Sequence, residues 1–149
     1  MTLQERLMAD LRQAMKGGDD TRRSLIRLVL AGVKNAEIDK GAPLDDSGVI
    51  DVISREVKRH RESIAEFSKG NRQDLVAKEE AELVILLEYL PQQMSREEIA
   101  EAARNVIEQV GARGPGDKGK VMSQLMPQLK GRAQGREINE VVSELLVGS

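Results

Sequence analysis

The chain has 149 residues, 40% of them hydrophobic and 32% charged, and a formal net charge of −2, which suits one helical domain or two small lobes. Cysteine is absent, which excludes a disulfide framework, a thiol nucleophile and a thiolate metal site. No apolar run is long enough for a membrane span and the N-terminus lacks the order of a secretory signal, so we expect a cytosolic (cytoplasmic) protein with no membrane partner.

Apolar residues at the three-to-four spacing of helices predict four helices in residues 1–92. The second has a broad apolar set that includes Leu28 and Ile38, as expected for a helix buried on more than one side. The fourth contains the apolar run 83–87, which alone would also fit a buried strand, but its acidic lead-in favours a helix. The first helix is expected over 3–15, and the second from 21 to a turn at 40–45. The third is expected from a cap at Asp45 or Asp46 to residue 69, and the fourth over about 74–90.

The rest of the chain is predicted to hold three helices behind a hinge at 90–94, because proline disfavours helix in the residue before it. Ser95 and Glu98 have the spacing of a capping box at the start of the first of these helices. Two short helices follow, near 117–130 and 136–147. The sequence thus predicts an all-α, two-lobed helical protein, with a four-helix N-terminal lobe at 1–92 and a three-helix C-terminal lobe at 93–149.

Positive charge is concentrated in one segment, because residues 111–136 carry six basic side chains and one acid. A locally positive segment on an acidic chain suits the binding of a polyanion. The alternative is a solvated turn whose cations compensate the C-termini of helices, and both explanations stay open. The candidate RNA-binding residues are Lys118, Lys120, Lys130, Arg132 and Arg136.

Residues 114–121 nearly match the phosphate loop Gly-x-x-x-x-Gly-Lys-Ser/Thr, but Val121 replaces the hydroxyl residue. Without that hydroxyl the loop lacks a ligand for Mg²⁺, and the element before it is a predicted helix, not a strand. A flexible linker is therefore favoured over a nucleoside-triphosphate site. Lys118 and Lys120 would still lie at the start of a helix, where free N–H groups favour a phosphate.

The sequence gives little support for a catalytic or metal site. His60 is the only histidine, so we interpret it as a surface residue and expect no histidine-based metal cluster. Glu79, Glu80 and Glu82 have no histidine near them in sequence and are interpreted as solubilising charge. The basic run at 55–61 is interleaved with acids, which is typical of a solvent face. We expect no catalytic residue, no metal and no cofactor.

Several short segments, spread over nearly the whole chain, carry a likeness to a known family. Together they resemble the GatB/YqeY family, and the resemblance implies a two-lobed all-helical fold. The segments are Arg23-Ser-Leu-Ile-Arg-Leu-Val-Leu30, Ala36-Glu-Ile-Asp39, Glu56-Val-Lys-Arg-His-Arg-Glu-Ser-Ile64, Glu79-Glu-Ala-Glu-Leu83, Glu88-Tyr-Leu-Pro-Gln-Gln-Met94, Gly119-Lys-Val-Met122, Gly131-Arg-Ala133 and Ile138-Asn139.

The resemblance also implies a function. The family includes the tail of the B subunit of the tRNA-dependent amidotransferase, which helps hold tRNA while amidation occurs in a separate cradle domain. A chain of 149 residues has no room for that cradle and resembles a stand-alone member. A carbon–nitrogen ligase label, with glutamine as amido-N-donor, would then describe an associated pathway, and the isolated chain is not expected to be an enzyme. In such tails basic residues surround the Gly-Arg-Ala turn, a role that Lys120, Lys130, Arg132 and Arg136 fill here, with Gln134 where the family often has Asp or Asn.

The leading hypothesis is a non-catalytic module that binds tRNA, or a tRNA-handling enzyme, through residues 113–136. Because Phe67 and Tyr89 are the only aromatic residues, it would recognise the backbone and shape of a folded RNA and would not stack on bases. The second hypothesis is a protein-interaction adaptor with no RNA contact. An enzyme that uses glutamine or ATP is the third.

Overall fold

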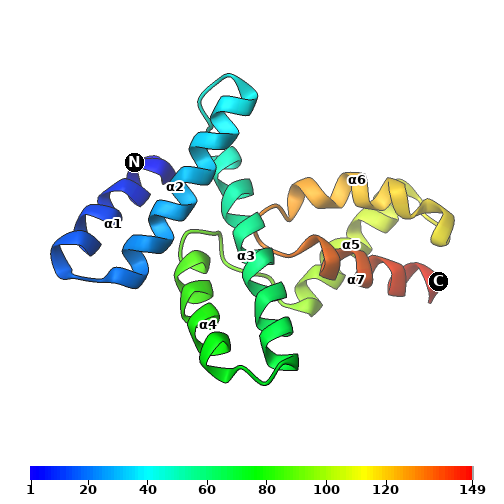
Figure 1. Ribbon diagram of the computed structural model, residues 1–149. Helices are drawn as coiled ribbons and strands as arrows, with labels where there is room; N and C mark the ends of the chain where they lie inside the picture. The colour runs from blue at the N-terminus through cyan, green and yellow to red at the C-terminus, as the bar shows by residue number, and fades with distance from the viewer. Residues whose placement is uncertain (149) are drawn as a thin grey trace. The chain divides into compact units, whose positions relative to one another are not determined.

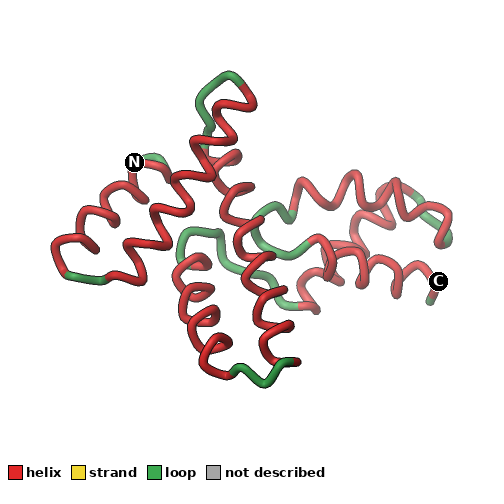
Figure 2. Tube along the Cα trace, in the orientation of Figure 1, coloured by secondary structure: helices red, strands yellow, loops and turns green. Residues whose placement is uncertain are grey.

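The computed structural model describes residues 1–148, and every regular element in that range is helical (Figures 1 and 2). The prediction of an all-α protein is confirmed. None of the described helices combines the length and apolar character needed to cross a membrane. The chain divides into two compact units, Met1–Leu90 and Pro91–Ser149. The first contains α1 (Leu3–Gly17), α2 (Asp20–Lys40), α3 (Asp46–Lys69) and α4 (Gln73–Leu87). The second contains α5 (Arg96–Val110), the 3-10 helix η1 (Pro115–Asp117), α6 (Lys118–Gln128) and α7 (Gly135–Val147).

The predicted boundary between two domains at residue 92 stays a prediction. Several helix starts, in contrast, follow directly from short polar residues that satisfy free backbone N–H groups. The Ser95 hydroxyl accepts from the backbone N–H of Glu98 at 3.2 Å, and the Glu98 carboxylate accepts from the N–H of Ser95 at 2.9 Å, which confirms the capping box. At α3 the cap is Asp45, while Asp46 accepts from the backbone N–H of Leu3 at 2.9 Å and ties the start of α1 to α3.

The core of the first unit is aliphatic except for Tyr89. Helix α2 lies close to α3 at Gly32, where an added Cβ would be 3.0 Å from a methyl group of Val52. The expectation that α2 is buried on more than one side is wrong for Leu28 and Ile38, which are exposed. At 100° per residue they point away from the buried side of α2. The core consists of Leu7, Leu25, Ile26, Val29, Val33, Val49, Val52, Ile53, Val57, Leu86 and Tyr89.

The core of the second unit is aliphatic throughout and lies between α5, α6 and α7. Val121 and Leu125, one helical turn apart on α6, are both fully buried in it. Its members are Ile99, Ala100, Ala103, Val106, Val121, Leu125, Leu129, Ile138, Val141, Val142 and Leu146.

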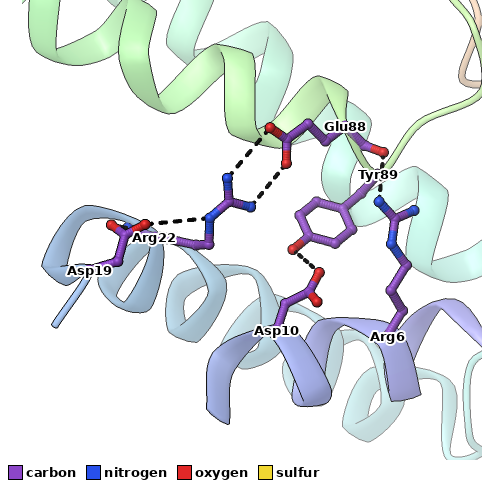
Figure 3. A network of polar contacts seen from close by, with 6 residues as sticks. All are labelled: Arg6, Asp10, Asp19, Arg22, Glu88 and Tyr89. Carbon is purple, nitrogen blue, oxygen red and sulfur yellow. Dashed lines mark hydrogen bonds and ion pairs between the residues drawn. The ribbon is translucent and has the colours of Figure 1, made fainter. Parts of the chain in front are cut away.

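A forked ion pair joins α2 to the end of α4 in the first unit (Figure 3). Two nitrogens of the Arg22 guanidinium donate to the two oxygens of the Glu88 carboxylate, at 2.9 and 3.4 Å. The Nε atom of Arg22 lies 3.6 Å from the carboxylate of Asp19, the N-cap of α2. Because both groups are planar, two parallel contacts fix their orientation as well as their distance.

Tyr89 follows Glu88 and connects the same region to α1 (Figure 3). Its hydroxyl donates to the carboxylate of Asp10. The guanidinium of Arg6 lies over the ring, 4.6 Å from its centroid, and donates to the carbonyl of Glu88 at 3.1 Å. Burial, together with the hydrogen bond to a negative carboxylate, raises the pKa of Tyr89 to about 12.

Replacing Tyr89 by phenylalanine (Y89F) keeps the ring and removes the donor to Asp10. We expect the free energy of unfolding to fall by about 1–2 kcal/mol near neutral pH, because a half-buried carboxylate loses its partner. The folded-state pKa is raised from 10.0 to about 12, so the hydroxyl's contribution is complete below pH 10 and is lost as the pH rises toward 12. Urea unfolding of both proteins from pH 7 to pH 11 should show their difference narrowing above about pH 10. A constant difference would contradict this role.

Candidate functional site

The five predicted RNA-binding residues lie in the second unit, at the start of α6 and around the turn between α6 and α7. Lys118 and Lys120 are in the first turn of α6, whereas Arg136 is in the first turn of α7. Lys130 and Arg132 lie in the turn that connects these two helices. Their contacts divide them into residues that present charge to solvent and a residue that supports the fold.

Arg132 supports the fold. Its Nε atom donates to the backbone carbonyl of Gln92 at 3.1 Å, and its own carbonyl accepts from the backbone N–H of Met94 at 2.8 Å. The side-chain amide of Gln93 donates to the carbonyl of Gly131 at 2.7 Å. The turn at 131–132 therefore holds the extended segment 92–94, whose backbone groups would otherwise lack helical partners. Sequence reasoning missed this role because it depends on a contact between segments about 40 residues apart.

Lys118 of α6 contacts α7, the helix that also carries Arg136. The Nζ atom of Lys118 donates to the Asn139 side chain at 2.6 Å. Asn139 follows Arg136 by three residues, so both project from the same side of α7. The Arg136 side chain is 88% exposed, and its Nε atom lies 3.4 Å from the carboxylate of Glu140. This contact is an exposed pair within one helix, the kind that adds little to stability.

Lys120 also presents its charge to solvent, with a side chain that is 71% exposed. Its Nζ atom lies 3.9 Å from the carboxylate of Asp117, at the outer limit for an ion pair. Lys130 is exposed as well. We call these cations, with Lys118 and Arg136, the basic surface; they lie in the first turns of α6 and α7 and in the turn between the two helices.

In the segment that resembles a phosphate loop, the carboxylate of Asp117 binds a nearby backbone amide. The other carboxylate oxygen of Asp117 accepts a hydrogen bond from the backbone N–H of Arg113 at 2.9 Å, so an internal anion occupies a loop amide. Val121, which stands where the phosphate loop has its hydroxyl residue, is fully buried in the core. Both facts favour the interpretation of this segment as a structural connection over a triphosphate site.

His60 differs from the sequence-based expectation, because it is buried between α3 and α4 and is not a surface residue. Glu79 and Glu82 of α4 approach its ring, although they follow it by 19 and 22 residues. The interpretation of His60 as an isolated surface residue, and of Glu79 and Glu82 as solubilising charge, is therefore wrong, whereas the expectation of no metal stays a prediction. The available signal was spacing: Glu79 and Glu82 are one helical turn apart, and so share a side of α4.

The charges around His60 favour its protonated form. Burial, the largest influence, disfavours a charged imidazole. The carbonyl of Glu56 and the carboxylates of Glu82 and Glu79 outweigh it, so the pKa of His60 is raised above its ordinary value. A buried histidine with this environment differs from the isolated surface histidine that its sequence position suggests.

The sequence matches a family of known proteins. Residues 4–146 match the family described as Yqey-like protein. The protein named Altered inheritance of mitochondria protein 41, mitochondrial, of Lachancea thermotolerans is 45% identical over 87 residues, covering 58% of this chain and 46% of that protein. The protein of the same name from Kluyveromyces lactis is 44% identical over 97 residues, covering 62% and 52%, respectively. The chain thus spans about half the length of the curated relatives it matches.

The prediction of a cytoplasmic protein is contradicted by these relatives, which are named as mitochondrial proteins. That prediction depended on the absence of an apolar run long enough to span a membrane and of a secretory signal. Neither absence distinguishes the cytosol from an aqueous compartment of an organelle. The match with the family covers nearly the whole sequence, and the chain therefore belongs to the family of Yqey-like proteins.

Proposed function

We propose that this chain is a non-catalytic module that holds tRNA, or a tRNA-handling enzyme such as the tRNA-dependent amidotransferase, with the basic surface as its contact to RNA. The observation that carries the proposal is the exposure of Lys120 and Arg136. Their side chains are 71% and 88% exposed, on a chain whose formal net charge is −2. Cations that are exposed to solvent can contact a phosphate group without any change in the packed core.

The energetics of the basic surface support this choice. Exposed pairs such as Lys120–Asp117 and Arg136–Glu140 contribute roughly 0–1 kcal/mol, so a phosphate that displaces the acid loses little. Binding several phosphates also releases counterions from the RNA, which favours association at low salt. Lys118, whose Nζ atom donates to Asn139 on α7, adds a third cation to the basic surface.

The kind of RNA follows from the aromatic residues. Phe67 and Tyr89, the only aromatics, belong to the first unit, and Tyr89 is buried. The second unit therefore offers no ring on which an unpaired base could stack. A contact through lysine and arginine alone recognises the phosphate backbone and the shape of a folded RNA, which suits tRNA better than an unstructured strand.

A charge reversal of Lys120 and Arg136 tests the proposal. We expect the K120E/R136E variant to lose most of its affinity for bulk tRNA at low salt. The slope of log K against log salt concentration should become less negative by about 1–2, because two phosphate contacts are removed. Fluorescence anisotropy of labelled tRNA across a salt series measures both quantities.

The matched control is K69E/R72E, which makes the same change of charge in the first unit at two exposed residues that also pair with acids, Glu66 and Asp74. This control should bind like the unaltered protein. If both variants weaken binding equally, the total charge of the chain matters and the basic surface has no special role. If neither does, the proposed RNA contact is absent.

One observation favours the protein-interaction alternative. The second unit has an open groove of about 590 Å³, lined by apolar side chains such as Ile107, Ala112 and Leu145. Charged side chains of both signs also line it: Arg104, Arg113, Glu108 and Glu144. An apolar groove can receive a side chain of a protein partner, and such binding depends weakly on salt. Ligase activity with glutamine as the amido donor remains a third and less favoured alternative.

Arg132 provides a second prediction, because its contacts indicate structural support. Replacing it by methionine (R132M) keeps much of the aliphatic stem and removes the hydrogen bond to the Gln92 carbonyl. We expect the free energy of unfolding to fall by about 1 kcal/mol and Tm by about 2–4 °C. The tRNA affinity of the folded variant should fall much less than that of K120E/R136E. Calorimetry and the anisotropy assay test this; unchanged stability with lost RNA affinity would make Arg132 a direct RNA contact.

A further inference from the structure

A compact polar cluster lies between α3 and α4 of the first unit, whereas the residues of the basic surface belong to the second unit. It consists of His60 on α3 and of Glu79 and Glu82 on α4, and we call it the His60 cluster. The three side chains are 7%, 21% and 19% exposed, respectively. The Nε2 atom of His60 is 2.9 Å from an Oε atom of Glu82 and 3.4 Å from an Oε atom of Glu79. Two carboxylates thus converge on one ring nitrogen.

The other ring nitrogen determines what Nε2 can do. Nδ1 lies 2.9 Å from the backbone carbonyl of Glu56, one turn earlier on α3. A carbonyl can only accept a hydrogen bond, so Nδ1 carries a proton. In a neutral ring Nε2 then presents a lone pair to two carboxylates, and three electron-rich atoms repel each other at short range. The cluster therefore needs a cation at this position, either a proton on Nε2 or a metal ion.

The balance of charge favours a divalent ion. A proton on Nε2 leaves one positive imidazolium against two carboxylates, a net charge of −1 in a largely buried place. A divalent ion beside a neutral imidazole brings the cluster to zero. Glu56 is a third carboxylate near the ring, with one oxygen 3.9 Å from Nδ1, but its charge is offset by Arg59 through a contact of 2.9 Å. The oxygen near Nδ1 is buried without a hydrogen-bond partner.

The geometry is also close to that of a metal site. At ligand distances of about 2.0–2.1 Å, two ligand atoms around a tetrahedral ion are roughly 3.3 Å apart. Here the contacts to Nε2 are 2.9 and 3.4 Å, and all three ligand atoms lie within 4.8 Å of one another. The bond from Nδ1 to a backbone carbonyl is the usual outer contact of a metal-binding histidine, which fixes the tautomer. Because the two glutamates are partly exposed, an ion can reach them from solvent.

We propose that His60, Glu79 and Glu82 bind a divalent transition-metal ion, with Zn²⁺ the best match to one imidazole and two carboxylates. The ion joins two neighbouring helices, α3 and α4, and is a structural clamp. It replaces the proton of the imidazolium, so metal binding releases a proton when His60 is charged. The site does not depend on the RNA contact, and either proposal can fail without the other.

Titration of the full chain with Zn²⁺ tests the proposal. After treatment with a chelator, the protein should bind one ion per chain with a dissociation constant in the micromolar range or tighter. Because His60 is the only histidine, the NMR spectrum has one set of imidazole signals, and these should shift as Zn²⁺ binds. Co²⁺ offers an optical readout, since its visible absorption reports the coordination of the bound ion.

Variants of α4 separate the proposed ligands from their surroundings. E79Q and E82Q should each weaken Zn²⁺ binding by at least about tenfold, because each replaces an anionic ligand by an amide. E80Q makes the same chemical change at the exposed residue between them and should bind normally. Circular dichroism of each metal-free variant checks folding. If E82Q fails to fold, E79Q, which loses only the longer contact of 3.4 Å, still gives a result.

Two outcomes would overturn the proposal. One is the absence of saturable Zn²⁺ binding together with unmoved imidazole signals. The other is equal affinity for Zn²⁺ in E79Q, E82Q and E80Q, which places the ion elsewhere. In either case a protonated His60, held between two carboxylates, accounts for the cluster.

Discussion

The first unit depends on the contacts that Glu88 and Tyr89 make at the end of α4. There, α2 contributes a forked ion pair through Arg22, and α1 contributes a carboxylate through Asp10 and a cation through Arg6. Aliphatic side chains around them supply most of the burial, but such side chains pack in many ways. Directed polar contacts select one arrangement because each requires a particular distance and orientation. Glu88 and Tyr89 are the last two residues before Leu90, where the first unit ends.

Local signals in the sequence predicted much of the fold. The capping box at Ser95 and the helical nature of α4 follow from residues that lie close together in the chain, and both are found. Local signals failed where the answer depended on another helix. Ile38 was expected to be buried, but it is exposed, on the side of α2 that faces away from the core. His60 was misjudged for the same reason, since its acidic neighbours come from α4.

The candidate RNA-binding residues were also only partly predictable from the sequence. That Lys120 and Arg136 are exposed could be expected from their place at helix starts, and the structure agrees. The contact of Arg132 with the Gln92 carbonyl could not be expected, because nothing in a cluster of like charges distinguishes a residue that binds backbone from one that faces solvent. A basic sequence motif can therefore serve folding and charge presentation at the same time, with different members for each.

The position of Tyr89 gives the molecule an internal optical reporter. The chain has no tryptophan and a single tyrosine, so its near-ultraviolet fluorescence arises almost wholly from one ring in the first unit. The far-ultraviolet signal of helices arises from both units. If the thermal unfolding curves from tyrosine fluorescence and from far-ultraviolet circular dichroism coincide, the two units unfold as one cooperative body. If the two curves differ, the units unfold separately. A composition poor in aromatics thus makes cooperativity between the units visible without any label.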